Sequence, residues 1–261
     1  GNSFVRKSVS LIDNRVYGYQ RWYSQFKRIQ RYSVLYPDIF PRLIKYGKDG
    51  NTGYFDIEYY DKGVNAQEYI EKCIDKKKID LFFNNLIETM GILHVTSIQS
   101  NCEAMDLYIY EEIEQKINDC YNNELFMDFI KYDEIIFNGS KVNSFLKVLD
   151  KYKTLCRKYY VSPKETFTHG NITLENLLFF PENNKFIFID PYEENIIDSK
   201  LAEFSQLLQS SNGKYEVYNR HNDYLLNGNE VAMEINESYG LNYLNNKLIK
   251  YLKDEFSEND Y

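Results

Sequence analysis

Two short apolar runs separated by a turn place the strongest restriction on how this chain can fold. The runs are Leu177–Phe180 and Phe186–Ile189, and the link Pro181–Lys185 contains the proline and asparagines that favour turns. This pattern predicts a β-hairpin, which returns the chain to the end at which it started. Asn176 directly precedes the first run and Asp190 directly follows the second, so we expect their side chains to lie together.

Polar residues stand at fixed spacings around this hairpin. His169-Gly-Asn171 comes first, Asn176 follows Asn171 after four residues, and Asp190 stands fourteen positions after Asn176. The segment resembles the active site of the small-molecule kinases with a protein-kinase-like fold, namely the aminoglycoside phosphotransferases, the choline kinases and their relatives. Their pattern reads His-Gly-Asp, four residues, Asn, a short hairpin, an apolar residue and Asp.

The resemblance implies an α+β fold of two lobes, with a small β-rich N-lobe at residues 1–60 and a larger, mainly helical C-lobe at residues 61–261. It also implies that Asn176 and Asp190 hold Mg²⁺ against the phosphates of a nucleotide, and oxygen ligands of this kind suit the cation. His169 is expected to brace the loop as a structural residue and to carry no proton.

Asn171 departs from the family, in which the matching position is the catalytic Asp. A carboxylate can take the proton of an attacking hydroxyl, whereas an amide oxygen can only accept a hydrogen bond. General-base assistance commonly accelerates a reaction by about 10²–10⁴, so Asn171 is expected to impair catalysis. Phosphoryl transfer depends mainly on positioning and charge neutralisation, so residual activity is compatible with this residue.

The N-terminal residues extend the resemblance. Ser3–Lys7 is similar to the N-lobe strand whose lysine contacts the α- and β-phosphates of ATP, so Lys7 is the implied phosphate contact. An ordinary surface lysine is the alternative at this position. Two further strands are predicted at Phe40–Tyr46 and Tyr54–Tyr60, and residues 47–53 form the turn between them.

Two features of the N-lobe depart from the family. No glycine-rich phosphate loop precedes Lys7, so the N-lobe is expected to be truncated. The helix after the first strand should carry a Glu that pairs with the lysine, but Tyr19 or Gln20 occupies about that place. A lysine without this partner can bind phosphate but is less well preorganised, which favours weak or absent catalysis.

The resemblance also suggests the ligands. Main-chain groups of Glu58, Tyr59 and Tyr60 would form the hinge that binds adenine, and the implied cofactors are Mg²⁺ and ATP or another nucleoside triphosphate. Downstream, Asp198–Gln209 and Lys214–Glu216 resemble phosphotransferase-like proteins of capsular polysaccharide biosynthesis, some of which are fused to nucleotidyltransferases. The implied partners are a small-molecule acceptor with a sugar-type hydroxyl and an adjoining nucleotidyltransferase domain.

Apart from the hairpin, the C-lobe is expected to be helical. Apolar positions recur densely in its first helix, and a turn is expected near residues 137–140. The predicted helices are Ile79–Leu93, Glu111–Tyr132, Lys141–Tyr160 and Leu241–Phe256.

Charge is unevenly divided along the chain. Residues 1–48 contain ten Lys and Arg against Asp13 and Asp38, so they carry +8, and the remaining residues carry −16 to give −8 in total. A basic first lobe would place the phosphates of a nucleotide in a positive field.

Several of these cations alternate with aromatic residues on a predicted helix. Such a surface can bind nucleic acid by neutralising phosphates and stacking on bases. The alternative is amphipathic packing, in which the apolar positions face the protein and the cations are solvated. We favour packing, so nucleic acid is not an expected partner. The residues at helical spacing are Val16, Tyr19, Tyr23, Phe26 and Ile29.

The sequence contains no apolar run long enough to span a bilayer and no charged-then-apolar leader. Its four cysteines form no Cys-x-x-Cys pair, and three histidines are too few to favour a zinc site. We therefore expect a cytoplasmic protein that does not act at a membrane.

The leading hypothesis is an ATP- and Mg²⁺-dependent phosphotransferase-like domain that acts on a hydroxyl of a sugar or related metabolite and is impaired by Asn171. The alternative is a pseudokinase, which keeps the fold as a binding or scaffold domain of a larger protein without transferring phosphate.

Overall fold

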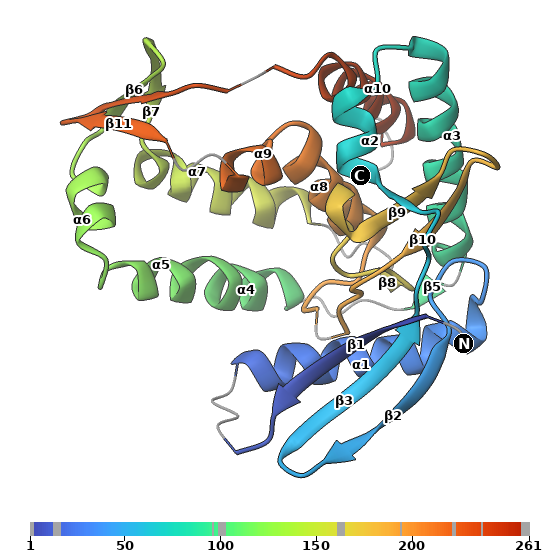
Figure 1. Ribbon diagram of the computed structural model, residues 1–261. Coiled ribbons are helices and arrows are strands. Elements are labelled where there is room, and N and C mark those ends of the chain that lie inside the picture. Colours follow the sequence, from blue (N-terminus) through green and yellow to red (C-terminus); the bar gives the residue numbers. More distant parts are fainter. Residues whose placement is uncertain are drawn as a thin grey trace. The chain divides into compact units, whose positions relative to one another are not determined.

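The computed structural model describes residues 3–12, 17–95, 97–98, 103–160, 165–193, 195–220, 223–235 and 237–256 (Figure 1). The chain divides into two compact units. Unit 1 comprises Gly1–Ser97, Thr166–Gly213 and Ser238–Leu252, and unit 2 comprises Ile98–Glu165, Lys214–Glu237 and Lys253–Tyr261. Both units combine helices with strands, so the predicted α+β class is confirmed. The predicted lobe boundary at residue 60 lies inside unit 1 and stays a prediction.

The strands of unit 1 are β1 (Phe4–Ser10), β2 (Leu43–Asp49), β3 (Thr52–Glu58), β4 (Val64–Asn65), β9 (Leu177–Phe180) and β10 (Lys185–Phe188). Its helices are α1 (Tyr17–Leu35), α2 (Ala66–Lys72), α3 (Lys76–Leu93), the short 3₁₀ helix η2 (Leu174–Asn176), α8 (Lys200–Ser211) and α10 (Tyr239–Glu255). The chain passes between the units at β5 (Ser97–Ile98) and β8 (Glu165–Thr166).

Three antiparallel strands of unit 1 form a sheet in the order β1-β3-β2. The register of β1 against β3 pairs Lys7 with Phe55. The turn between β2 and β3 contains Gly50 at φ +55°, a left-handed conformation that glycine adopts without strain. Because this turn is tight, β2 continues to Asp49, beyond the predicted end at Tyr46.

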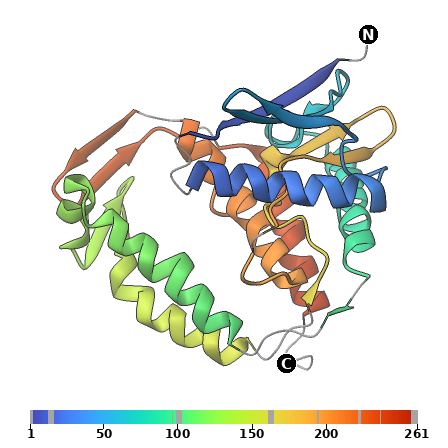
Figure 2. The ribbon, with the colours of Figure 1, turned by 90° about the horizontal axis from the view of Figure 1, so that it is seen from below.

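Helix α1 lies along one side of this sheet (Figures 1 and 2). Trp22 and Phe26 each pack against Phe55, with ring centroids 5.7 Å apart. The packing interpretation of this helix is wrong in two places, because Tyr23 is 40% exposed whereas Arg28 is only 2% exposed. The buried face of α1 therefore includes the Arg28 cation, which is buried because it pairs with Glu193 and Asp198.

The main core of unit 1 forms around the hairpin of β9 and β10, which pair antiparallel as predicted. Strand β4 joins the free side of β9, giving the order β10-β9-β4. Phe82 of α3 packs against Phe179 and Phe186 of the hairpin, with ring centroids 4.9 Å apart, and all three side chains are buried. Burial of each such side chain contributes about 1.5–3 kcal/mol, so this cluster holds the hairpin firmly against α3.

Helix α10 packs against α2 and α3 of unit 1. Gly240 permits a close approach, because a Cβ at this position would lie 1.9 Å from the carbonyl oxygen of Ile70 in α2. Tyr251 contacts Phe83 of α3. The predicted helix at Leu241–Phe256 is confirmed with shifted ends. Its buried leucines follow helical spacing and are Leu241, Leu244 and Leu248.

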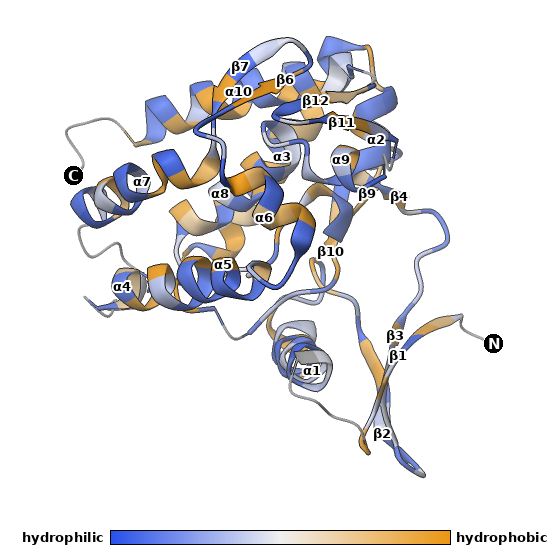
Figure 3. Ribbon diagram, turned by 90° about the vertical axis from the view of Figure 1, so that its left-hand side faces the viewer, coloured by the Kyte–Doolittle hydropathy of each residue, from blue (hydrophilic) through white to orange (hydrophobic). Residues whose placement is uncertain are grey.

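The helices of unit 2 are α4 (Ala104–Tyr108), the π-helix η1 (Ile109–Glu114), α5 (Gln115–Cys120), α6 (Glu124–Ile130), α7 (Phe145–Tyr159) and α9 (Tyr215–Arg220). Its strands are β6 (Glu134–Phe137), β7 (Ser140–Asn143), β11 (Tyr224–Asn227) and β12 (Glu230–Met233). They form one sheet in the order β11-β12-β6-β7, in which only β12 and β6 run parallel. Apolar and charged residues alternate in short groups along α7, as the orange and blue segments of this helix in Figure 3 show.

Two predicted helices of unit 2 are wrong in part. The helix predicted from Lys141 begins at Phe145, because β6 and β7 form a hairpin across Asn138 and Gly139, whose φ angles are +48° and +79°. The helix predicted at Glu111–Tyr132 breaks after α5 and restarts at α6. The expectation that the C-lobe is helical apart from one hairpin is also wrong, because unit 2 contains a four-stranded sheet.

Within the described ranges, no helix combines the length and the apolar character needed to cross a lipid bilayer.

Candidate functional site

The hairpin brings the two predicted metal positions together. The Ile189 N–H donates to the carbonyl oxygen of Asn176 at 2.9 Å, so Asp190, the next residue, lies beside Asn176. The side-chain amide of Asn176 donates to the carbonyl oxygen of Asn171 at 2.8 Å, which ties the loop to the start of β9. The structure therefore places Asn171, Asn176 and Asp190 in one neighbourhood, and their roles stay predictions.

Lys7 reaches this neighbourhood from β1. Its ammonium group contacts the Asp190 carboxylate and donates to the side-chain oxygen of Gln25 at 3.3 Å. The Lys7 and Asp190 side chains are 24% and 32% exposed, so the ion pair lies at the edge of the protein interior. From the same helix as Gln25, the indole of Trp22 donates to the Lys7 carbonyl oxygen at 3.1 Å and fixes this part of the strand to α1.

The helix residue that faces Lys7 is Gln25, which corrects the assignment of that place to Tyr19 or Gln20. Those two residues lie in the first turn of α1, whereas Gln25 lies more than a turn further along on the buried face. An amide oxygen accepts a hydrogen bond from the ammonium group but offers no negative charge. Gln25 of α1 therefore orients the Lys7 side chain, and of these two contacts only Asp190 neutralises its charge.

His169 is fully buried and joins the loop to the hairpin. Its Nδ1 accepts the N–H of Asn171 at 3.2 Å, so Nε2 carries the proton and donates to the Ile189 carbonyl oxygen at 2.8 Å. Burial lowers the pKa of His169 to about 4, against an opposing effect of the nearby Glu203 carboxylate. A neutral, doubly hydrogen-bonded imidazole suits bracing of the loop and does not suit proton transfer at neutral pH.

Gly170 occupies a position that tolerates no side chain. Its φ is +80°, and a Cβ would lie 2.2 Å from both the Tyr192 carbonyl oxygen and the Asn195 side-chain nitrogen. The conformation and the crowding both require glycine. The absence of a side chain at Gly170 thus lets the loop that contains His169 and Asn171 pack directly against the segment that follows Asp190.

Helix α8 braces the same loop through three polar side chains that the sequence did not suggest. The Glu203 carboxylate accepts the N–H groups of His169 and Gly170, and it lies 2.6 Å from Nε2 of His94 at the end of α3. Gln206 accepts the Ile172 N–H at 2.9 Å, and its amide donates to the Gly170 carbonyl oxygen at 3.1 Å.

Ser210 completes the row by accepting the Leu174 N–H at 2.9 Å. Glu203, Gln206 and Ser210 fall at positions i, i+3 and i+7 of α8, which lie on one face of a helix. This spacing of polar residues is the signal that could have identified them.

Arg28 forms a second buried polar cluster, between α1 and the segment after Asp190. Its guanidinium group lies 2.7 Å from Glu193 and 3.1 Å from Asp198, and it donates to the Thr168 carbonyl oxygen at 2.7 Å. Burial opposes the charge, but the two carboxylates outweigh it and raise the pKa of Arg28. Since Arg28 and Gln25 are three residues apart on α1, the cluster also sets the position of Gln25.

The predicted hinge residues lie at the end of β3. The N–H of Glu58 donates to the Arg42 carbonyl oxygen at 3.0 Å, and the N–H of Tyr59 donates to the Ser3 carbonyl oxygen at 3.3 Å. Burial, followed by the charge of Glu58, raises the pKa of Tyr60 to about 12. Both amide donors are thus engaged within the protein, and an adenine ring could use them only by displacing these partners.

The residues present fit Mg²⁺ that arrives with a nucleotide. Asp190 supplies a carboxylate, and Asn176 supplies an amide oxygen, since one N–H of its side chain donates to the Asn171 carbonyl oxygen and fixes the orientation of the amide. Mg²⁺ is commonly held by one or two protein oxygens while phosphates and water complete its shell. In the part of the chain that the structure describes, no group of three His, Cys, Asp or Glu side chains could hold a metal ion by itself.

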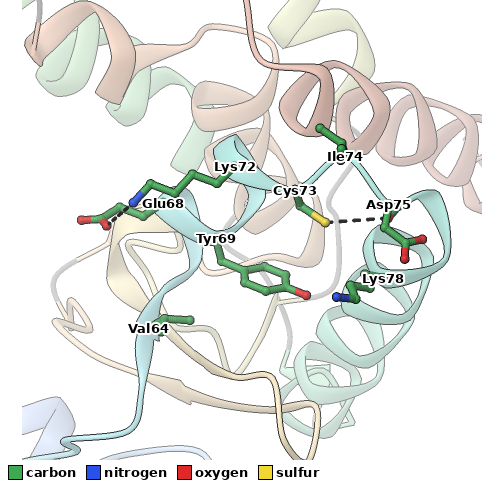
Figure 4. Close-up of a pocket in the computed structure, with 8 residues that line it drawn as sticks. All are labelled: Val64, Glu68, Tyr69, Lys72, Cys73, Ile74, Asp75 and Lys78. Atoms are coloured by element: carbon green, nitrogen blue, oxygen red, sulfur yellow. Dashed lines mark hydrogen bonds and ion pairs between the residues drawn. The ribbon is translucent and has the colours of Figure 1, made fainter.

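A cavity of about 400 Å³ lies elsewhere in unit 1, between α2 and the start of α3 (Figure 4). Tyr69 lines it, and so do Glu68 and Lys72, which form an exposed ion pair 3.2 Å long. The cavity contains none of the predicted site residues. Its lining residues are Val64, Glu68, Tyr69, Lys72, Cys73, Ile74, Asp75 and Lys78.

No family model matches the chain, and no curated protein is similar to it. Among solved structures, a candidate fructosamine-3-kinase from Haemophilus somnus 129PT has a TM-score of 0.46 and 14% sequence identity, covering 96% of this chain and 84% of that one. A likeness at this level assigns neither a family nor an activity to this chain.

Proposed function

We propose that this chain is a kinase-like phosphotransferase domain that binds ATP, or another nucleoside triphosphate, with Mg²⁺. The observation that supports this proposal is the meeting of Lys7, Gln25 and Asp190 at one ammonium group. Strand β1, helix α1 and the end of the hairpin contribute one residue each. Positioning of phosphates and neutralisation of their charge are the main requirements of phosphoryl transfer, and this arrangement serves both.

Each residue has a separate role in the proposed reaction. Lys7 contacts the phosphates through its N–H donors. Asp190 and Asn176 hold Mg²⁺, which neutralises charge on the transferred phosphoryl group. The side-chain oxygen of Asn171 accepts a hydrogen bond from the acceptor hydroxyl and orients it. As the new O–P bond forms and the bond from the transferred phosphorus to the leaving diphosphate breaks, the hydroxyl proton passes to a phosphate oxygen or to water, because an amide does not take it. We therefore expect transfer that is slower by about 10²–10⁴ than with a carboxylate at position 171.

The acceptor we propose is a hydroxyl of a sugar or related metabolite, in the cytoplasm and in capsular polysaccharide biosynthesis, beside a nucleotidyltransferase domain. The support is the sequence of Asp198–Gln209 and Lys214–Glu216 alone. Two residues of the first stretch have structural contacts: Asp198 forms an ion pair with Arg28, and the Glu203 carboxylate accepts the His169 N–H.

A second candidate is a pseudokinase that binds nucleotide without transferring phosphate. The specific observation in its favour is that both Gln25 and Asn171 are amides at positions where the resembled family has carboxylates. An amide at position 171 removes the proton acceptor, and an amide at position 25 removes a charge that would hold Lys7.

Thermal stability of the purified chain with ATP or ADP tests the proposal. A ligand that binds only the folded state stabilises it by RT ln(1 + [L]/Kd), about 2.7 kcal/mol at a hundredfold excess over Kd, so a rise in Tm is expected. Lys7→Met should abolish the rise. Lys48→Met is the matched control, because Lys48 is an exposed lysine of β2 in the same sheet.

Phosphate transfer to a panel of sugars by the natural chain and by Asn171→Asp separates the two candidates. A gain of about 10²–10⁴ in Asn171→Asp supports the enzyme. Stabilisation by nucleotide without turnover in either protein supports the pseudokinase. A Tm that no nucleotide changes would overturn both.

A further inference from the structure

We infer that this site binds the phosphates of a nucleotide without needing a divalent cation. The inference rests on the proposed nucleotide binding and concerns the charges that face the phosphates. Lys7 contributes one positive charge and Asp190 one negative charge, while Gln25, Asn171 and Asn176 are uncharged. The five residues that carry the proposed site are therefore neutral as a set.

Lys7 already neutralises the Asp190 carboxylate, a charge that a divalent cation would otherwise have to neutralise. An ammonium group has three N–H donors. One meets Asp190 and one meets the side-chain oxygen of Gln25, so the third remains for a phosphate oxygen. In this arrangement Lys7 keeps its contact with Asp190 and stands between that carboxylate and the phosphates. The repulsion between the two anionic groups is thereby screened within the protein.

The side-chain amides contribute in the same direction. An amide nitrogen has two N–H donors, whereas an ionised carboxylate has none. Asn176 uses one of its donors on the Asn171 carbonyl oxygen, which holds the amide in place and leaves the second for a ligand. A phosphate oxygen accepts such donors, but it would be repelled by a carboxylate at position 171.

Carboxylates at positions 25 and 171 would change this balance. Each would add one negative charge, so the same set of residues would carry a net charge of −2. One Mg²⁺ brings two positive charges, which would balance the two negative charges of carboxylates at positions 25 and 171. The amides of this chain carry no such charges. A site with both carboxylates needs that cation before it accepts an anionic ligand, and the site of this chain does not. Asp190 and Asn176 can still accept Mg²⁺ when the nucleotide brings it.

The test is calorimetric titration of the whole chain with ATP, first with EDTA and then with MgCl₂. We expect binding in EDTA with a Kd within about threefold of the value with Mg²⁺. Gln25→Glu combined with Asn171→Asp should weaken binding in EDTA by about tenfold or more, and Mg²⁺ should restore it. Lys7→Met should lose binding under both conditions, whereas Lys48→Met should bind as the natural chain does.

The possible results separate the inference from the proposed function. Binding of ATP by the natural chain only when Mg²⁺ is present would overturn the inference and leave the proposed function intact. Equal Mg²⁺ dependence of the natural chain and the double variant would also overturn it, since the two amides would then have no effect. An absence of binding under every condition would overturn the proposed function and the inference with it. Melting curves of each variant in buffer establish that it is folded before titration.

Discussion

His169 shows how far the interior of unit 1 can change the chemistry of one residue. Its imidazole is buried, accepts the Asn171 N–H, donates to the Ile189 carbonyl oxygen, and has a pKa lowered to about 4. In the unfolded chain the same group has a pKa near 6.5. Between these values the unfolded state binds a proton that the folded state does not bind. Stability contributed by neutral His169 is therefore present above pH 6.5 and falls as the pH drops toward 4.

We predict that the free energy of unfolding decreases by roughly 2 kcal/mol between pH 6.5 and pH 5 through this residue, at about 1.4 kcal/mol per pH unit. Urea unfolding of the natural chain and of His169→Asn at pH 7 and pH 5 measures it. The variant should be less stable at pH 7, because it replaces a bridging ring, but should lose less stability on acidification. An equal loss in both proteins would show that other groups cause the pH dependence.

Some residues of the candidate site could be predicted from the sequence, and others could not. The proximity of Asn176 and Asp190 could be predicted, because a hairpin brings its flanking residues together whatever surrounds it. Gln25 and Arg28 were not, because they are polar residues on the buried side of a helix, where apolar periodicity predicts none. Their burial depends on partners such as Asp198, which lies 170 residues further along the chain than Arg28.

At the scale of elements, α1 is held to the segment after Asp190 by ionic contacts in addition to apolar packing. Arg28 links it to Glu193 and Asp198, and the Ser24 hydroxyl accepts the Glu193 N–H at 2.7 Å. Since Gln25 lies on the same side of the helix, this link sets where α1 meets Lys7. The link therefore belongs to the support of the proposed phosphate site.

We predict that Arg28→Met destabilises the protein by about 3–5 kcal/mol, because it leaves the Asp198 carboxylate without its cation and removes the buried partner of Glu193. Arg28→Lys keeps the charge but loses the forked geometry, so an intermediate loss is expected. Arg31→Met is the matched control: Arg31 also pairs with Glu193, at 3.1 Å, but is 42% exposed, and the expected loss is below about 1 kcal/mol.

Chemical denaturation measures all three variants, and thermal shift with ATP measures the effect on Lys7. We expect Arg28→Lys to respond less to ATP than the natural chain does, since α1 would hold Gln25 less firmly. Equal losses of stability in Arg28→Met and Arg31→Met would contradict the role assigned to Arg28.

The elements themselves were predictable to different degrees. The hairpin, marked by two apolar runs around a turn, and the last helix, marked by apolar residues at helical spacing, were predicted well. The short strands of unit 2 were missed, because a segment such as Ser140–Asn143 is polar and too short to show an alternating pattern. It becomes a strand by pairing with Glu134–Phe137 across a turn that needs two positive φ angles.

Across unit 1 as a whole, the positive charge of the first 48 residues is offset by acids from later parts of the chain. Arg6 is a clear case, because its side chain lies 2.7 Å from Asp56 in β3. Among the described residues of this stretch, the cations that form such ion pairs include Arg6, Lys7, Arg28, Arg31 and Arg42. The surplus of cations in the sequence therefore does not become an equally basic surface.

We predict that the chain shows no retention on heparin and no RNA binding at about 0.1 M salt, where the Debye length is roughly 10 Å. Phosphate contacts of a nucleic-acid-binding surface would persist at this ionic strength and weaken linearly with the logarithm of salt concentration. Fluorescence anisotropy with labelled single-stranded RNA measures the affinity. Micromolar binding with a steep salt dependence would restore the nucleic-acid alternative.

The order in which unit 1 is assembled has a consequence for biosynthesis. The chain leaves this unit at Gly213 and re-enters it at Ser238, and only then contributes the helix whose Gly240 rests on Ile70. During translation, α2 therefore gains its contact with α10 only after the last long helix has been synthesised. Unit 1 therefore cannot be completed before residues 214–237 of unit 2 have been synthesised. A chain that ends before Leu241 would lack the buried leucines of α10 and would leave the apolar side chains they cover exposed, and such surfaces are recognised by chaperones.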